Sequence, residues 1–356
     1  MASIMTNASA LTALQSLSAT NKALEQTQAR ISTGYRVADA VDNAAYWSIA
    51  TTMRSDNQSL STVQDALGLG ASKVDTAYTG MNKVLTAVDD LKQKLVAAYG
   101  ASAADKAKIQ TEIDALQGQM KSFAGAATFS GSNFLSVTST RVAADNDGVQ
   151  PDVKIVAAFN RSSGGVVSLG TIDIDIESVK LFDNGAANAV KNAGLLDRET
   201  TIYATATDQA TYDAAYATAI AAGKSDIDAN TDAETAVGTP APANIAKISV
   251  HNLDITAAGV TDDVITQMIS KVDNVLKALT DAATVLGAAK KQIDLQKTFT
   301  QSLMDSIDKG VGQLVDADMN KESTRLQALQ VQQQLGIQAL SIANANSQNI
   351  LSLFKG

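Results

Sequence analysis

Residue types that could support catalysis or bind a metal are few in this 356-residue chain. It has one histidine, His251, and no cysteine, which excludes a zinc site built on two histidines of one helical turn and excludes a thiol nucleophile. The sequence has no GxxxxGK phosphate-binding loop and no GxGxxG dinucleotide motif, and no serine or threonine has a base in its sequence context. The sequence therefore predicts neither an enzyme nor a cofactor.

An acidic row is the one pattern that resembles a cation site. Asp173, Asp175 and Glu177 alternate with isoleucines, and alternate residues of a strand share one face. Because no further ligands converge on this row from elsewhere in the sequence, we interpret it as the solvated face of a strand. His251 has no partner motif, and we interpret it as structural.

Charge and proline are concentrated in the middle of the chain. Of a net charge of −9, nearly all arises between Arg141 and Ile255, where sixteen acidic residues face eight basic ones. All three prolines also lie in the middle third, so both ends are free of the strongest helix breaker. An acidic middle with nearly neutral ends argues against nucleic acid as a partner.

Membrane and leader signals are weak. No stretch approaches eighteen consecutive apolar residues, so we expect no transmembrane segment. The first 17 residues lack a basic start followed by a continuous apolar core, so we expect no Sec-type signal peptide.

The C-terminal stretch, from about Val311 to Phe354, has a heptad seam. Steps of three and four residues connect Leu326, Leu329, Gln333, Gly336, Leu340, Ala343, Ser347, Ile350 and Phe354. No charged residue occurs between Leu326 and Leu353, although a solvated helix would normally be rich in charge. The pattern predicts one helix that is buried against other protein and that needs a partner helix along its seam.

The pattern of residues 3–33, near the N-terminus, predicts a helix that could be this partner. Large apolar residues recur every seven positions in two rows, Ile4/Leu11 and Leu17/Leu24/Ile31. The apolar surface that these few large side chains can bury is too small to offset the conformational entropy lost when about thirty residues become ordered. This helix is therefore not expected to be stable alone.

Between the ends, the pattern predicts further helices over 44–99, 103–124 and 262–308, and strands around 153–157 and 172–176 joined by a loop. The expected fold is mainly α, with long antiparallel helices in coiled-coil bundles formed by both termini, a small β-hairpin region and an inserted outer α+β domain. We expect an inner coiled-coil domain (1–40 and 311–356), a helical shell domain with the hairpin (41–182 and 251–310) and a surface-exposed outer domain (183–250).

Both ends resemble bacterial flagellins. At the C-terminus the resemblance lies in RLQAL (325–329), QQQLG (332–336), QALSIAN (338–344) and ILSLF (350–354). At the N-terminus it lies in ISTGYRV (31–37), DNAA (42–45) and IA (49–50), and together the matching regions cover about the first 135 and last 100 residues. Details near Tyr46 and Met53 are similar to the flagellins of rhizobia and their relatives.

The resemblance implies a structural subunit that polymerises into the bacterial flagellar filament for swimming motility. Implied partners are other copies of the chain, the flagellar export machinery with its chaperone, the filament cap and the hook-associated proteins. It also implies export in an unfolded state, assembly at the distal tip, an extracellular location, and terminal helices that form the inner tube. The alternative is a hook–filament junction protein, which resembles flagellin at its ends. The expected polymerisation interface comprises Leu11, Leu14, Leu17, Leu24, Ile31, Leu326, Leu329, Leu340, Ala343, Ile350 and Phe354.

In many flagellins, host receptors recognise two stretches of the chain. This chain departs from the family pattern in both of them. In the stretch read by the animal receptor, Asp90 stands where the family has an arginine and Lys92 replaces a second arginine; Asp89 is the residue before. In the stretch read by plants, Val41 replaces a usual lysine, and Tyr46 and Trp47 replace a small-aliphatic pair.

Overall fold

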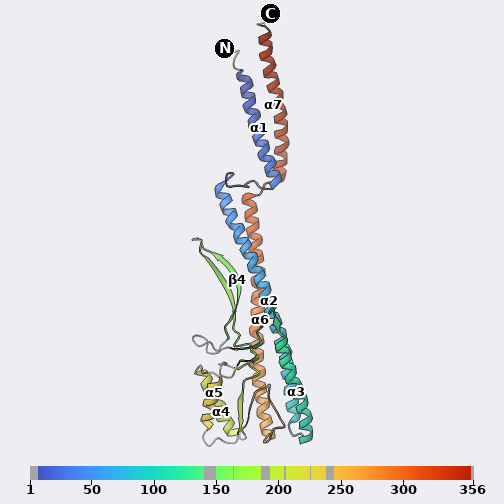
Figure 1. Ribbon diagram of the computed structural model, residues 1–356, viewed down its shortest axis with the longest axis vertical. Helices are drawn as coiled ribbons and strands as arrows, with labels where there is room; N and C mark the ends of the chain where they lie inside the picture. The colour runs from blue at the N-terminus through green and yellow to red at the C-terminus, as the bar shows by residue number, and fades with distance from the viewer. Residues whose placement is uncertain are drawn as a thin grey trace. The chain divides into compact units, whose positions relative to one another are not determined.

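The computed structural model describes residues 7–139, 150–162, 164–185, 193–203, 206–224, 226–237 and 244–353 (Figure 1). The chain divides into two compact units, one formed by residues 1–61 and 301–356 and the other by residues 62–300. Two long helices, α2 (Ala44–Ala98) and α6 (Asp262–Val315), contribute residues to both units. The three-domain division expected from the sequence stays a prediction.

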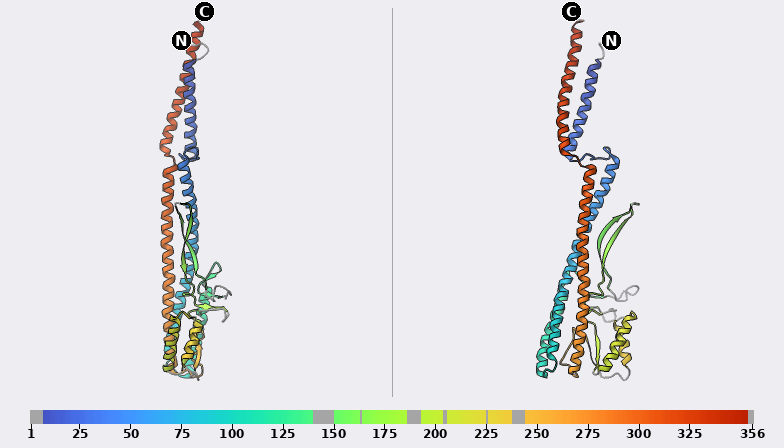
Figure 2. Two further views of the ribbon diagram at one scale, coloured as in Figure 1. Left: turned by 90° about the vertical axis from the view of Figure 1, so that its left-hand side faces the viewer. Right: turned by 180° about the vertical axis from the view of Figure 1, so that it is seen from behind.

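In the first unit, the two ends of the chain form an antiparallel helix pair. Helix α1 (Ala8–Thr33) lies beside α7 (Met319–Leu353) in every view (Figures 1 and 2). The direction follows from contacts at both ends of the pair, since Asn7 donates to the Ala343 carbonyl and Arg30 bonds Glu322. This pairing of the termini confirms the fold class expected from the heptad seams.

The ends of α1 are fixed by residues that suit them. The Asn7 side chain accepts a hydrogen bond from the Ala10 N–H at 3.1 Å, which satisfies one of the unpaired donors of the first turn. Gly34 ends the helix in the left-handed conformation, at φ 75°, and donates to the Arg30 carbonyl at 2.9 Å. Gly34 is therefore the C-cap of α1.

The prediction of one helix from about Val311 to Phe354 was wrong. Helix α6 ends at Val315 and α7 begins at Met319, after a short polar break. The Asp318 carboxylate accepts from the N–H groups of Asn320 and Lys321, which starts the new helix.

A segment distant in sequence binds the end of α6 at this break. Arg36 and Val37 donate their N–H groups to the Val315 carbonyl at 2.7 and 3.2 Å, and Ala317 donates to the Gly34 carbonyl at 2.9 Å. Val37 is buried with Val315 in a small apolar cluster. We call residues 34–37 and 314–317 the clasp. Its intersegment hydrogen bonds satisfy carbonyls that the end of a helix leaves without partners.

The second unit has a core formed by α2, α3 (Ala103–Ala126) and α6. Apolar and neutral residues at steps of three and four along α6, from Val272 to Ile307, are buried or half-buried, and so is the corresponding series of α2 from Met53 to Leu95. Ile49 is 49% exposed, because Ala50 and Met53 occupy the face of α2 that packs on Val311 and Val315.

Short strands lie against this helical core. Strands β4 (Val153–Arg161) and β5 (Val167–Ile174) form the antiparallel hairpin that the alternation predicts, with an irregularity between Val156 and Ala158. β1 (Thr128–Phe129) pairs with β2 (Ser132–Asn133), and β3 (Ser136–Val137) pairs in parallel with β6 (Phe182–Asp183). β7 (Thr200–Tyr203) pairs with β8 (Asn244–Ile248), and α4 (Ala206–Ala221) and α5 (Asp226–Val237) are inserted between these two strands.

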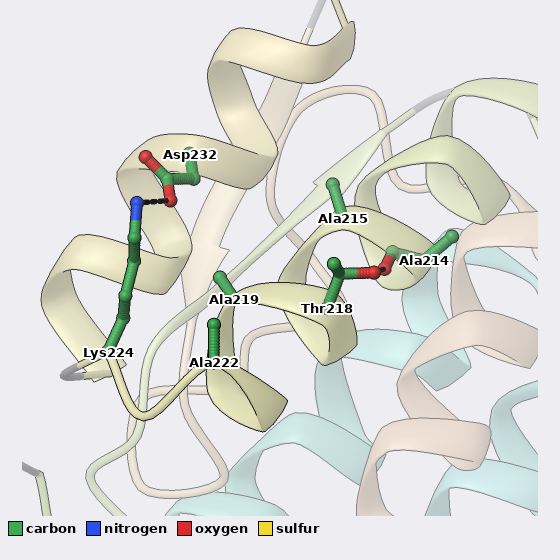
Figure 3. Close-up of a pocket in the computed structure, with 7 residues that line it drawn as sticks. All are labelled: Ala214, Ala215, Thr218, Ala219, Ala222, Lys224 and Asp232. Carbon is green, nitrogen blue, oxygen red and sulfur yellow. Dashed lines mark hydrogen bonds and ion pairs between the residues drawn. The ribbon is translucent and has the colours of Figure 1, made fainter.

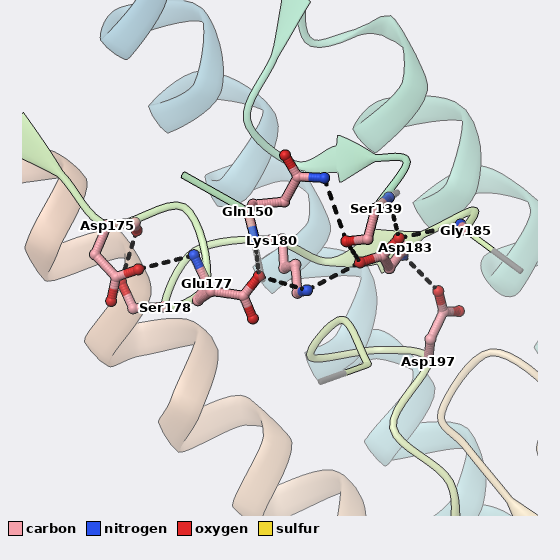
Figure 4. A network of polar contacts seen from close by, with 9 residues as sticks. All are labelled: Ser139, Gln150, Asp175, Glu177, Ser178, Lys180, Asp183, Gly185 and Asp197. Atoms are coloured by element: carbon pink, nitrogen blue, oxygen red, sulfur yellow. Dashed lines mark hydrogen bonds and ion pairs between the residues drawn. The ribbon is translucent and has the colours of Figure 1, made fainter. Parts of the chain in front are cut away.

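A buried ion network anchors the segment after the hairpin (Figure 4). The Lys180 ammonium, which is 1% exposed, contacts the carboxylates of Glu177 at 2.8 Å and Asp183 at 2.9 Å. Asp183 also accepts from the Ser139 N–H at 2.9 Å, and its own N–H donates to Asp197. Burial raises the pKa of Asp183, but its hydrogen bonds from Ser139 and Lys180 outweigh burial and hold that pKa below its usual value. The buried lysine is thus held by two carboxylates rather than left unpaired.

Gly194 lies directly against the backbone of Leu181 and Phe182, where a larger residue does not fit. A Cβ at Gly194 would lie 2.3 Å from the Leu181 carbonyl oxygen and 2.6 Å from the Phe182 nitrogen, and backbone atoms cannot move aside. We expect Gly194→Ala to lower the free energy of unfolding of the full chain by about 3 kcal/mol, measured by urea denaturation.

Gly118→Ala is the matched control for this prediction. Gly118 is exposed on α3 and has nothing within 4 Å of the added Cβ, so helix propensity should stabilise the variant by up to about 1 kcal/mol. Equal stability of the Gly194 and Gly118 variants would contradict the close contact.

Candidate assembly interface

The heptad seam of α7 faces α1. From residue 323 to residue 345, the buried or half-buried residues are Leu326, Leu329, Gln333, Gly336, Leu340 and Ala343, and all others in this range are exposed. These six are the members of the predicted series that lie there. The side chain of Ile350 and all of Phe354, both predicted for the interface, lie outside the described residues.

The seam of α1 differs in part from the predicted one. Leu17, Leu24 and Ile31 are half-buried, as are Thr20 and Ala23 between them, and Thr27 is fully buried. Leu11 and Leu14, however, are 59% and 54% exposed. Of the five α1 residues predicted for the polymerisation interface, Leu17, Leu24 and Ile31 are thus half-buried in the helix pair and two are exposed, and their role in polymerisation stays a prediction.

Small and polar side chains let the two helices approach closely. A Cβ at Gly336 would lie 3.2 Å from Cδ1 of Leu17, so glycine provides the space that this leucine fills. Gln333 donates to the Asn21 side chain at 2.8 Å, and Arg30 contacts Glu322 at 3.5 Å. These polar contacts set the register of the pair, while the amount of large apolar surface between the helices stays small.

Apolar side chains also lie on the outer faces of the pair. On α7, Val331, Leu335, Ile337 and Ile342 are 54–64% exposed, within the stretch that has no charged residue. On α1, Leu11 and Leu14 line a shallow groove of about 520 Å³ with Gln15, Ser18, Ala19 and Lys22. Exposed apolar surface of this kind marks an interaction surface.

The comparisons with known proteins decide the family. Residues 4–140 match the model of the bacterial flagellin N-terminal helical region, and residues 269–354 match that of the C-terminal helical region. This chain belongs to the bacterial flagellin family. It is 46% identical to a flagellin of Brucella melitensis and to flagellin C of Rhizobium meliloti, with all of each chain covered. It is 44% identical to flagellin A of Rhizobium meliloti, again over all of both chains.

Membership of this family makes the chain a structural subunit of the bacterial flagellar filament. The family is structural rather than catalytic, and nothing in the matches favours the hook–filament junction protein. No helix in the described part of the chain is long and apolar enough to cross a membrane.

The positions that depart from the receptor-read pattern are accessible, with one exception. Val41 is 96% exposed in the turn before α2, and Tyr46 and Trp47 are about 40% exposed, at 41% and 38%. Asp89 and Asp90 are exposed on α2.

Lys92 is the exception, because it is half-buried and contacts Asp273 of α6 at 2.6 Å. The hydrogen bonds from Lys92 and Lys277 lower the pKa of Asp273. The sequence did not predict this ion pair, because nothing in it shows which residue of α6 lies opposite Lys92.

The acidic row is divided between solvent and an ion pair, and His251 packs against an aromatic ring. Asp173 and Asp175 are exposed, whereas Glu177 turns to Lys180, and no group of residues in the described ranges could hold a metal ion. His251 lies edge-on to the Phe182 ring with centroids 5.4 Å apart, and burial lowers its pKa.

A groove between α4 and α5 is lined mainly by small side chains (Figure 3). It has a volume of about 410 Å³, and Lys224 and Asp232 form an ion pair across its edge. The Thr218 hydroxyl, which points along it, donates to the Ala214 carbonyl at 2.8 Å. The groove offers few polar groups to a ligand.

Proposed function

We propose that copies of this chain polymerise through the outer faces of the α1–α7 pair and that the paired termini form the inner tube of the filament. The observation that carries the proposal is the uncharged α7 surface, which exposes Val331, Leu335, Ile337 and Ile342 although its seam is already covered by α1. Burial of these side chains between copies stabilises the assembly by roughly 1.5–3 kcal/mol for each large apolar side chain. The proposed contacts between copies therefore use the exposed residues of both helices, including Leu11 and Leu14 of α1, whereas the seam residues pair the two helices within one copy.

The helix pair is expected to order fully only on assembly. Its seam contains alanine, threonine, glutamine and glycine at many positions, so little apolar surface is buried between two long helices. The second unit, by contrast, has an extensive core of fully buried Leu, Ile, Val and Met side chains. Isolated helix pairs with weak seams are marginal in water, whereas the second unit is expected to be stable in the monomer.

Limited proteolysis tests this difference. Trypsin is expected to remove about residues 1–35 and 315–356 from the monomer and to leave a stable fragment, because local opening of a weakly packed pair exposes its backbone to the protease. The same ends should resist cleavage in filaments, where neighbouring copies cover them. Mass spectrometry of the fragments gives the boundaries, and equal protection of the ends in verified monomer would refute the proposal.

The proposed role as a filament subunit also implies a route of export and a set of partner proteins. The chain is expected to leave the cell unfolded through the flagellar export machinery with its chaperone, and to assemble at the distal tip beneath the filament cap, beyond the hook-associated proteins. The absence of cysteine supports this, since no disulfide can form and block unfolding. Residues 183–250 would then face outwards, and the filament would lie outside the cell.

The insertion between β7 and β8 is expected to be dispensable for assembly. Tyr203 pairs with Asn244, so the two ends of the insertion are adjacent, and Tyr212 and Ala233 belong to a separate small apolar cluster. Replacing residues 204–243 by Asn-Gly closes the two strands into a hairpin with a favoured two-residue turn. The variant should form filaments of normal length by electron microscopy. Loss of filaments from a folded variant would show that the insertion makes obligatory contacts.

A further inference from the structure

The hairpin of β4 and β5 continues beyond the part that packs on the helical core (Figure 1). Near its base, Ile155 is buried directly against Gly70 of α2. From residue 158 to residue 170, by contrast, no described residue is buried, although the strands stay paired as far as Arg161 and Val167. A two-stranded ribbon with no buried side chain is marginal in water. We call residues 158–170 the distal half of the hairpin, and it lacks the cover that would stabilise it.

One face of the distal half is apolar. Because β5 runs without interruption, Leu169 and Val167 share the face opposite to that of the buried Ile172. They are 59% and 46% exposed. Their cross-strand partners are Phe159 and Arg161, and the Arg161 Cζ lies over the Phe159 ring at 5.8 Å from its centroid. A solvated strand face would normally be polar, so this one has the composition of an interaction surface.

A β-bulge places the aromatic ring on this face. The register shifts between Val156 and Ala158, so Ala157 is an extra residue in β4. By strict alternation Phe159 would share the face of Ile155, which packs on the core. The bulge instead pairs Phe159 with the residue of β5 that points to the opposite face, and bulges commonly re-aim a side chain in this way.

The remaining side chains of the distal half fit the same interpretation. The face shared with Ile172 has only small or polar residues there, which are Ala158, Asn160, Ser168 and Gly170. Val166, in the turn, is 70% exposed and extends the apolar surface. We call Phe159, Val166, Val167 and Leu169 the hairpin face.

Charge favours a second copy as the partner of this face. Arg161 is the one charged residue in the sequence from 158 to 170, and it is positive, whereas a whole copy has a net charge of −9. A subunit of the flagellar filament is also surrounded by copies of its own family. Filaments grow by heterologous contacts, in which one face of a subunit meets a different face of the next, so an unpaired face on each copy is expected.

We propose that the hairpin face packs against a second copy of this chain in the filament. This contact lies in the second unit and is separate from the contact proposed for the outer faces of α1 and α7. It rests on the role of the chain as a filament subunit and does not depend on which surface of the terminal helices is used.

Thiol protection tests the contact directly, because the chain has no cysteine and an introduced one is unique. Leu169→Cys and Ser168→Cys place the thiol on opposite faces of one strand, at neighbouring positions that are both exposed in the monomer. Each variant is co-assembled with an excess of the parent chain, and mass spectrometry follows its alkylation by iodoacetamide. Leu169→Cys should react at least about tenfold more slowly in filaments than as monomer, whereas Ser168→Cys should react at nearly the same rate in both. Val167→Cys, on the same face, replaces Leu169→Cys if that variant is not incorporated.

Aspartate at the same two positions measures the contribution of the contact to assembly. Leu169→Asp should raise the lowest concentration at which filaments form by about tenfold or more, because the charge would be buried against the next copy. Ser168→Asp is the matched control and should change this concentration little. Neither variant should alter thermal unfolding of the monomer, since both side chains are exposed there.

Four results would each overturn the proposal. Leu169→Cys could react equally fast in monomer and filament, or be protected already in the monomer by its own chain. Ser168→Cys could be protected as strongly as Leu169→Cys, or Leu169→Asp could assemble at the concentration of the parent chain. Normal filaments from a variant with aspartate on the outer face of α7, such as Leu335→Asp, would instead refute the contact of the terminal helices and leave this one standing.

Discussion

Leu340→Asp is expected to abolish filament formation while the second unit stays folded. Leu340 is half-buried in the seam of α7, between Gly336, which contacts Leu17, and Ala343, whose carbonyl accepts from Asn7. A carboxylate there has no cationic partner in the seam, and burial of an unpaired charge costs several kcal/mol. The cost recurs in every subunit, so assembly should fail at concentrations at which the parent chain polymerises fully. Sedimentation and electron microscopy measure filaments, and thermal unfolding reports on the second unit.

Two other aspartate variants separate pairing from assembly. Leu335→Asp places the charge on the exposed outer face of α7, so it should leave the monomer unchanged and still prevent polymerisation if copies cover that face. Ala217→Asp, on an exposed position of α4, adds the same charge away from the termini and should polymerise normally. Normal filaments from Leu340→Asp would mean that the seam is assigned to the wrong face.

The seam of α7 could be predicted from the sequence because its large apolar residues recur at heptad spacing and its other residues are uncharged. The seam of α1 could be predicted only in part. Its buried positions include alanines and threonines such as Thr27, which hydrophobicity does not mark, whereas the conspicuous Leu11 and Leu14 lie outside it. Apolar periodicity thus identifies a helix with more than one apolar face but does not say which face meets which partner.

Features that depend on contacts between distant residues were not predictable. The break between α6 and α7 is stabilised by the clasp, where Arg36 and Val37 bind Val315 across most of the chain length. The pocket lined by α4, β7 and α6 likewise brings together residues distant in sequence, and the polar link from Tyr212 to Asn230 holds α4 against α5. None of these pairs has a local sequence pattern, because each partner residue is common and the distance between them in sequence is arbitrary.

The chain is expected to be a weak ligand for the animal flagellin receptor. In the flagellins that this receptor reads, the corresponding stretch presents arginines, whose planar guanidinium makes bidentate contacts that neither aspartate nor lysine reproduces. Asp90 is exposed, so its carboxylate would meet the acceptors of the receptor and repel them. Lys92 is held by Asp273, so a contact with the receptor would also have to break that ion pair. Reporter cells given purified monomer should need at least about a hundredfold more of it than of a typical enterobacterial flagellin.

A reversal series tests the cause of the weak response. Asp90→Arg combined with Lys92→Arg should restore much of the reporter signal, whereas Asp89→Asn, which removes a neighbouring charge without adding a donor fork, should restore little. The plant-recognised stretch has its own reversal, Val41→Lys, at a position that is 96% exposed and therefore free to take a charged side chain without a folding cost. A response of the parent chain equal to that of the enterobacterial protein would refute the proposal. A weak parent response that the two arginines leave unchanged would show that the missing arginine donors are not the cause, and would point to the contact between position 92 and Asp273 or to residues outside this stretch.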